Sequence, residues 1–274
     1  MSIKIVLDSS ADLTEMEGIP FAFAPLKICT DDREFTDDQS IHVADMVDYL
    51  SGYKGRSSTS CPNAEDYLAA FGDAEEILCI TITGGLSGSC NCARSAADLY
   101  REAHPDRRVE VVDSLTAGPE IALMAEHAAE KIRAGASLDQ IMASLGHYKT
   151  ELLFALESLK NFANNGRVSK AAAAAAGLLG IRAVGRASDE GTLQVLDKTR
   201  GEIKTLDAIT RHLWDYGYRG GRIRIHHCYA ENAVKRLIER IRLHFPEAPI
   251  TVAPTRGLCS YYAERGGFLV GFET

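Results

Sequence analysis

Three short apolar runs, each ending in polar turn residues, constrain the fold of this chain most strongly. The runs and the turns that follow them are Ile3–Leu7 with Asp8-Ser9-Ser10, Ile77–Ile82 with Thr83-Gly84-Gly85, and Val109–Val112 with Asp113-Ser114. Short, mainly apolar runs of this length, here interrupted by Lys4 and Glu110, are typical of strands in an α/β sheet. Because stretches with a helical pattern alternate with these runs, the sequence predicts an α/β domain with a doubly wound, mostly parallel sheet over residues 1–150.

Local signals mark the starts of several helices in this first part. The expected capping or first-turn residues are Ser40, Asn63, Pro119 and Ser137, the last in a capping-box match with Gln140. A further helix is expected over residues 88–102, directly after a loop rich in glycine and serine. A doubly wound sheet needs such helices on both of its faces.

The pattern changes after residue 150, where we expect a second, α+β domain over residues 151–274. Its expected elements are a small-residue helix over Ala171–Ala176, a hairpin of residues 181–184 and 193–196, helices over 203–216 and around 234–241, and strands over 222–228, 249–253 and 267–272. No linker rich in proline, glycine or serine separates the two parts. We therefore expect them to pack tightly and to leave a ligand cleft between them.

Composition and charge exclude several classes of protein. The 274 residues carry 30 Lys and Arg against 38 Asp and Glu, a net charge of −8 at pH 7. The basic residues are scattered, which argues against a dedicated nucleic-acid-binding protein. No segment approaches the ~20 apolar residues of a membrane span, and the N-terminus turns polar too early for a signal peptide. Seven cysteines without zinc-ribbon spacing favour reduced thiols, so we expect a soluble, cytoplasmic protein.

Hydroxyl-rich loops follow the expected strands, and ligands of open α/β sheets gather at the carboxyl ends of strands. The loops are residues 8–12, 57–62, 84–89 and 113–114. Glycines allow a backbone to approach a ligand, and the free N–H groups of a helix start attract an anion. The loops therefore suit a single carboxylate or phosphate, although each also has an ordinary reading as helix-capping or turn chemistry.

Motifs for enzymatic chemistry are incomplete. No segment matches GxGxxG or GxxxxGK[ST], so we expect no nucleotide cofactor. Residues 85–88 follow the hydrolase nucleophile elbow GxSxG until Ser89 stands where the last glycine belongs. A serine hydrolase with Ser87 as nucleophile and His226 or His227 as base stays open as an alternative. The two histidines have no third ligand at a telling spacing, so we expect no metal site.

Six strings, taken in order, resemble the DegV family over essentially the full length. They are Asp8–Leu13, Thr59-Ser60-Cys61-Pro62 for the usual TSQP, Leu86-Ser87-Gly88-Ser89 for LSGT, Asp113-Ser114, Asn165–Ser169 for GGRxS, and Gly266–Val270 before the end. Each string alone is weak, but six in order are fairly specific.

The resemblance implies a two-domain protein that is not itself an enzyme. It implies binding of one long-chain fatty acid between the domains, with the carboxylate presented to a separate fatty acid kinase that makes the acyl phosphate. The family's carboxylate-binding hydroxyls fall on Thr59 and Ser87. The supporting positions that we expect are Ser60, Gly88, Ser89, Arg167 and Tyr262. A binding protein for another small anionic lipid remains the alternative.

Two residues depart from the family pattern. Cys61 replaces the amide side chain of TSQP, and Tyr262 stands where many members have a histidine. A phenol still donates a hydrogen bond, but it does not become cationic near neutral pH. We therefore expect carboxylate recognition to be tuned differently here.

Overall fold

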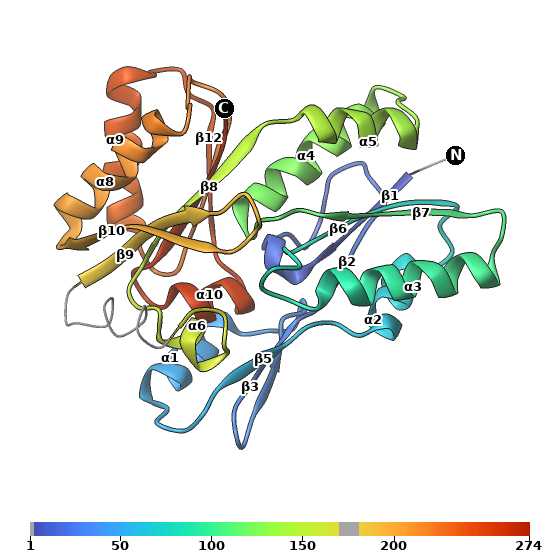
Figure 1. Ribbon diagram of the computed structural model, residues 1–274, viewed down its shortest axis with the longest axis horizontal. Helices are drawn as coiled ribbons and strands as arrows, with labels where there is room; N and C mark the ends of the chain where they lie inside the picture. The colour runs from blue at the N-terminus through green and yellow to red at the C-terminus, as the bar shows by residue number, and fades with distance from the viewer. Residues whose placement is uncertain (1–2, 170–180) are drawn as a thin grey trace.

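The computed structural model describes residues 3–169 and 181–274, and within them the strands form three sheets. Figure 1 shows the two larger sheets side by side, with the third sheet and helix α1 below them. The helix expected over Ala171–Ala176 lies outside the described residues. No described helix combines the length and the apolar character that crossing a membrane would need.

The first sheet has the strand order β2-β1-β6-β7, and all of its neighbouring pairs are parallel. Its strands are β1 (Ile3–Asp8), β2 (Phe21–Ala24), β6 (Glu76–Thr81) and β7 (Arg108–Asp113). One face packs against α4 (Pro119–Arg133) and α5 (Leu138–His147), and the other against α2 (Ala64–Phe71) and α3 (Ser89–Ala103). The doubly wound parallel sheet predicted from the apolar runs is confirmed.

The second sheet has the order β10-β9-β8-β13-β11-β12 and is mixed, since only β11 and β12 run parallel. Its strands are β8 (Thr150–Leu156), β9 (Ile181–Ala187), β10 (Leu193–Arg200), β11 (Ile223–His227), β12 (Ile250–Pro254) and β13 (Phe268–Glu273). Helices α8 (Glu202–Asp215) and α9 (Glu231–His244) cover one face. The expected α+β character of this part is confirmed, including the hairpin of β9 and β10.

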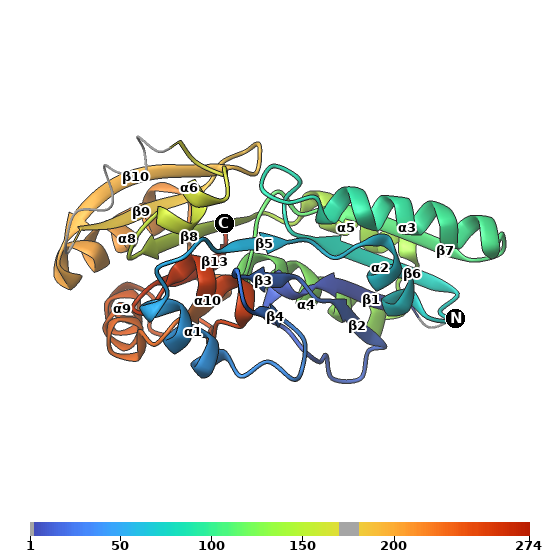
Figure 2. The ribbon, with the colours of Figure 1, turned by 90° about the horizontal axis from the view of Figure 1, so that it is seen from below.

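The third sheet is small and antiparallel, and the sequence patterns did not predict it. It joins β4 (Glu34–Thr36), β3 (Lys27–Cys29) and β5 (Ser58–Ser60). With α1 (Val43–Gly52) it packs beside α6 (Lys160–Asn164) and α10 (Gly257–Ala263), as Figure 2 shows from below. Ile28 and Met46 of this segment share a core with Phe154 of the second sheet. The segment thus contacts both larger parts, and the division at residue 150 stays a prediction.

The predicted helix starts are correct with one exception. Asn63 and Ser137 each form a capping box, and Pro119 lies in the first turn of α4. Ser40 does not cap α1, because that helix begins at Val43 and His42 occupies the capping position. The amide and hydroxyl of Ser40 donate instead to Asp38, at 2.8 and 2.6 Å, so its side chain is committed to the preceding turn.

Candidate functional site

A cavity lies between the two larger sheets and helix α10. Its wall is mostly apolar and includes Leu152, Phe154, Leu156, Phe162, Leu258 and Leu269. The turn of the β9–β10 hairpin borders it, where the hydroxyl of Thr83 donates to the carbonyl of Gly191 at 2.9 Å. This bond links the end of the first sheet to the hairpin of the second and helps to bound the cavity.

Strand β8 supplies one side of the cavity because its side chains alternate. Leu152, Phe154 and Leu156 line the cavity, whereas Leu153 and Ala155 point into the core beneath α8 and α9. Successive side chains of a strand point to opposite faces, so the same strand builds the protein core and the cavity wall.

The hydrophilic end of the cavity gathers side chains from four separate segments. Thr59, Ser87, Arg167 and Tyr262 all line it. The hydroxyls of Thr59 and Tyr262 lie 2.8 Å apart, and the guanidinium of Arg167 lies 5.6 Å from the centre of the Tyr262 ring. Arg167 also donates from Nε to the carbonyl of Leu86 at 2.6 Å, next to Ser87. The structure thus brings together four residues that the sequence strings place far apart.

The chemistry of this end suits an anion. Burial, which outweighs the opposing influence of Arg167, raises the pKa of Tyr262 to about 12, so its phenol stays neutral near pH 7 and can donate a hydrogen bond. The hydroxyls of Thr59 and Ser87 are neutral donors, and Arg167 is permanently charged. Hydrogen bonds from such groups to a carboxylate are charge-assisted and short.

The other expected positions lie outside the cavity wall. Ser60 is exposed, because it points to the opposite side of β5 from Thr59. Gly88 is exposed at the start of α3, and Ser89 is buried beneath Ser87, with 3.0 Å between their hydroxyls. Ser89 can therefore orient Ser87, whereas no contact described here links Ser60 or Gly88 to the cavity.

Asn165 supports the hydrophilic end and was not among the expected site residues. Its side-chain oxygen accepts from the amide of Thr59 at 3.0 Å, and its nitrogen donates to the hydroxyl of Tyr261 at 3.0 Å. Tyr261 in turn lies 2.9 Å from the hydroxyl of Ser57. Asn165 belongs to the same sequence motif as Arg167, residues 165–169, and that motif is the one signal in the sequence that pointed to it.

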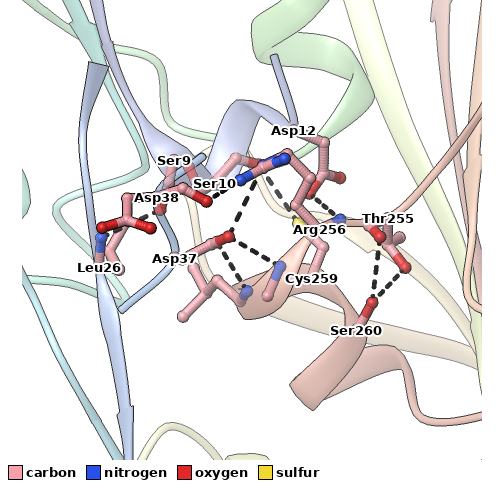
Figure 3. Close-up of polar contacts among 12 residues, drawn as sticks. Ser9, Ser10, Asp12, Leu26, Asp37, Asp38, Thr255, Arg256, Cys259 and Ser260 are labelled. Atoms are coloured by element: carbon pink, nitrogen blue, oxygen red, sulfur yellow. Dashed lines mark hydrogen bonds and ion pairs between the residues drawn. The ribbon is translucent and has the colours of Figure 1, made fainter. Parts of the chain in front are cut away.

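Helix α10 carries Tyr262, and two buried aspartates hold its start (Figure 3). The carboxylate of Asp37 accepts from the amides of Gly257 and Leu258, each at 2.9 Å. The carboxylate of Asp12 accepts from the amide of Arg256 at 2.7 Å. Burial raises the pKa of Asp37 to about 6. Both contacts span more than 200 residues, so the position of Tyr262 depends on the fold of the N-terminal part.

The hydrolase alternative lacks its nucleophile–base pair. The hydroxyl of Ser87 pairs with Ser89, and the ring of His226 is buried between Asp12 and Arg224. His227 contacts the amide of Ala230 through Nδ1. A serine nucleophile needs a base within hydrogen-bond reach, and the hydrogen bonds of His226 and His227 go to partners other than Ser87. Within residues 3–169 and 181–274, no group of three or more His, Cys, Asp or Glu side chains could hold a metal ion.

Solved structures with the same fold contain fatty acids. A DegV family protein from Eubacterium eligens loaded with heptadecanoic acid is 41% identical, with a TM-score of 0.97 and full coverage of both chains. The Fatty Acid Kinase (Fak) B3 protein of Streptococcus pneumoniae loaded with linoleic acid is 42% identical, with a TM-score of 0.97 over 100% of this chain and 99% of that one.

Comparisons of sequence point the same way. A DegV domain-containing protein of Streptococcus pneumoniae is 42% identical over 279 aligned positions, covering 100% of this chain and 99% of its own. The family model described as "Uncharacterised protein, DegV family" matches residues 2–273. With the fold, the arrangement of the cavity and these similarities in agreement, the chain belongs to the DegV family.

Proposed function

We propose that this protein binds one long-chain fatty acid, with the acyl chain in the cavity and the carboxylate at Thr59, Ser87, Arg167 and Tyr262. The observation that carries the proposal is the lining of the cavity: its wall is mostly apolar, and the donors of Thr59, Arg167 and Tyr262 lie in contact with one another beside Ser87. Relatives loaded with heptadecanoic acid and linoleic acid, each above 40% identity, support this ligand class.

The two parts of the ligand contribute differently to affinity. Each buried methylene contributes about 0.8 kcal/mol before the cost of ordering the chain. A hydrogen bond to the charged carboxylate contributes about 1.5–3 kcal/mol. The acyl chain therefore supplies most of the affinity, and the four donors fix which end of the acid lies near the surface.

We further propose that the protein is a carrier that presents the carboxylate to a separate fatty acid kinase in the cytoplasm. The name of the Streptococcus pneumoniae relative, the Fatty Acid Kinase (Fak) B3 protein, supports this role. Thr59, Ser87 and Arg167 are only partly buried, so the carboxylate that they hold is near the solvent. A kinase can reach an acid in that position without withdrawing its chain from the cavity.

The first experiment identifies the ligand that the purified protein carries. Native mass spectrometry is compared with denaturing mass spectrometry, and the released compound is identified. We expect near one-to-one occupancy by a fatty acid. A protein that is empty and takes up no added fatty acid would contradict the proposal, and a different anionic lipid would favour the alternative ligand.

Paired variants test the assignment of the carboxylate end. Thr59→Val combined with Ser87→Ala removes two hydroxyls at little change in shape, and we expect binding to weaken by a factor of about 100 or more. The matched control is Ser60→Ala, since Ser60 is the exposed neighbour on the other side of β5. If the control weakened binding as much as the double variant, the assignment of the carboxylate end would be wrong.

A further inference from the structure

Two cysteines meet beside the hydrophilic end of the cavity. Cys61 lies two residues after Thr59, and Cys92 lies in the first turn of α3, which begins just after Ser87. A Cβ atom built at Gly88 would lie 3.1 Å from Sγ of Cys61, so this sulfur rests directly on the start of α3.

Helix geometry places Cys92 on the same side of α3 as Gly88. The amide of Cys92 donates to the carbonyl of Gly88 at 3.0 Å, one turn away. Residues four apart share a helix face, and their side chains lean toward the N-terminus of the helix. The Cys92 side chain therefore leans toward the place that the Cys61 sulfur occupies. Burial first, and then the neighbouring Cys61 thiol, raise the pKa of Cys92, which agrees with direct contact.

Exposure distinguishes this pair from most other thiols of the chain. Cys61 and Cys92 are both partly exposed, whereas Cys79, Cys90, Cys228 and Cys259 are buried. Cys29 is also partly exposed, but it belongs to β3 and points toward Glu34. A small oxidant in solution can therefore reach both members of the pair.

We propose that Cys61 and Cys92 form a reversible disulfide that clamps the loop of Thr59 to helix α3 and slows the exchange of the bound fatty acid. The oxidant is a low-molecular-weight disulfide. One cysteine, as thiolate, attacks this disulfide and releases one small thiol; the second cysteine then displaces the other small thiol from the mixed disulfide. The protein loses two protons and two electrons, and the small disulfide is reduced to two thiols.

The effect on exchange rests on the function proposed above. Thr59 and Ser87 line the same end of the cavity but belong to different segments, β5 and the loop before α3. A fatty acid that leaves through this end has to pass between donors on those segments. A covalent bond between Cys61 and Cys92 restricts their separation, because it joins the two segments a few residues from each donor.

The test uses the full-length, fatty-acid-loaded protein with and without glutathione disulfide. Remaining free thiols are alkylated, and the digested protein is mapped by mass spectrometry. We expect a linked peptide pair containing Cys61 and Cys92. We also expect transfer of the acid to phosphatidylcholine vesicles to slow at least threefold after oxidation and to recover after treatment with dithiothreitol.

Two variants separate the pair from the other thiols. Cys92→Ser should abolish both the linked peptide and the effect of oxidation on transfer, while Cys29→Ser should preserve both. The proposal is overturned if glutathione modifies the thiols without producing the linked peptide. It is also overturned if the disulfide-linked protein transfers its acid as fast as the protein with free thiols. If the protein with free thiols held no fatty acid, the proposed function would be overturned. The peptide map would still decide independently whether the disulfide forms.

Discussion

At the scale of single residues, Tyr262 sets the chemistry of the proposed carboxylate site. Its hydroxyl lies 2.8 Å from that of Thr59. Since burial raises the pKa of Tyr262 to about 12, the phenol is a neutral donor throughout the neutral range. Histidine at this place titrates near an ordinary pKa of about 6.5 and can become a cation.

Replacing Tyr262 should therefore change how binding depends on pH. We expect Tyr262→Phe to weaken fatty acid binding about tenfold at every pH from 6 to 8, because it removes one donor to a carboxylate. We expect Tyr262→His to bind more tightly as the pH falls through this range, because a protonated imidazole adds a charge beside the carboxylate. Displacement of a fluorescent fatty acid, read as the ratio of each variant to the wild type, measures both effects.

The ratio to the wild type is the useful quantity, since it cancels the titration of groups that the proteins share. A constant ratio for Tyr262→His from pH 6 to 8 would mean that the side chain at this position does not face the carboxylate. Tyr262 would then belong to the packing against Phe162, whose ring centre is 4.3 Å away.

At the scale of elements, helix α10 is positioned by a carboxylate from a distant part of the chain. The two carboxylate oxygens of Asp37 accept hydrogen bonds from the two backbone amides at the start of this helix. An asparagine could accept only one of these bonds, because its side-chain NH₂ group is a donor. We expect Asp37→Asn to lower the free energy of unfolding by about 1–3 kcal/mol and to weaken fatty acid binding through displacement of Tyr262. Chemical denaturation and ligand displacement measure the two effects.

An exposed aspartate provides the control for this variant. Asp106→Asn removes the same charge from the surface and should leave both stability and binding close to those of the wild type. Normal binding by Asp37→Asn, at a concentration of denaturant where it is folded, would show that α10 does not depend on Asp37 for its position.

Strand β8 should determine the length of acyl chain that the cavity accepts. It leads toward α6, which carries Phe162 next to Tyr262, so Leu156 lies nearer the carboxylate end and Leu152 nearer the opposite end. We expect Leu152→Trp to fill that end and to weaken binding of eighteen-carbon acids much more than that of twelve-carbon acids. Affinities measured over a series of chain lengths check this.

Leu153 is the matched control, because it is the next residue of β8 but points into the core. Leu153→Ala should lower the free energy of unfolding by about 2–5 kcal/mol without changing the order of chain-length preference. Equal loss of affinity for short and long acids in Leu152→Trp would show that Leu152 does not border the end of the acyl chain.

The elements differ in how well the sequence predicts them. β1, β6 and β7 were predictable because each is a short, mainly apolar run that ends in polar turn residues. The caps at Asn63 and Ser137 were predictable because capping depends on residues close together in the sequence. The third sheet was not, since three-residue strands such as β5 carry too little periodicity. In the candidate site, the strings pointed to Thr59 and Ser87. Asp37 escaped notice because its partners are 220 residues away, a relation that only the fold creates.

At the scale of the whole molecule, a buried polar network joins the two larger sheets. Nε2 of His226 in β11 accepts from Nε of Arg224 at 2.9 Å, so its proton lies on Nδ1 and is donated to Asp12 at 2.8 Å. Arg224 also pairs with Glu126 of α4. The side chains of His226 and Asp12 are fully buried. The network ties the loop after β1 and helix α4 to the second sheet.

Buried carboxyl groups make the stability of the whole molecule depend on pH. Burial raises the pKa of Asp8 to about 6 and that of Glu120 to about 7, against ordinary values of 3.8 and 4.5. For each group the folded state keeps its proton over a range in which the unfolded chain has lost it. Stability therefore falls as the pH rises from the unfolded pKa to the folded pKa, and the loss is complete above the folded value.

Glu120 allows this to be tested at one position. Its carboxyl oxygens contact the hydroxyls of Thr116 and Thr150 at 2.5 and 2.8 Å, and a glutamine can keep both contacts while carrying no charge. We expect Glu120→Gln to lose less stability than the wild type between pH 4.5 and 7, and to be more stable than the wild type above pH 7 by an amount on the order of a few kcal/mol. Denaturant unfolding at a series of pH values measures the difference. The control is Glu239→Gln at an exposed position, whose curve of stability against pH should run parallel to that of the wild type. If the curve of Glu120→Gln also ran parallel, the folded protein would hold Glu120 charged. Its contacts with Thr116 and Thr150 would then favour the anion enough to offset the effect of burial.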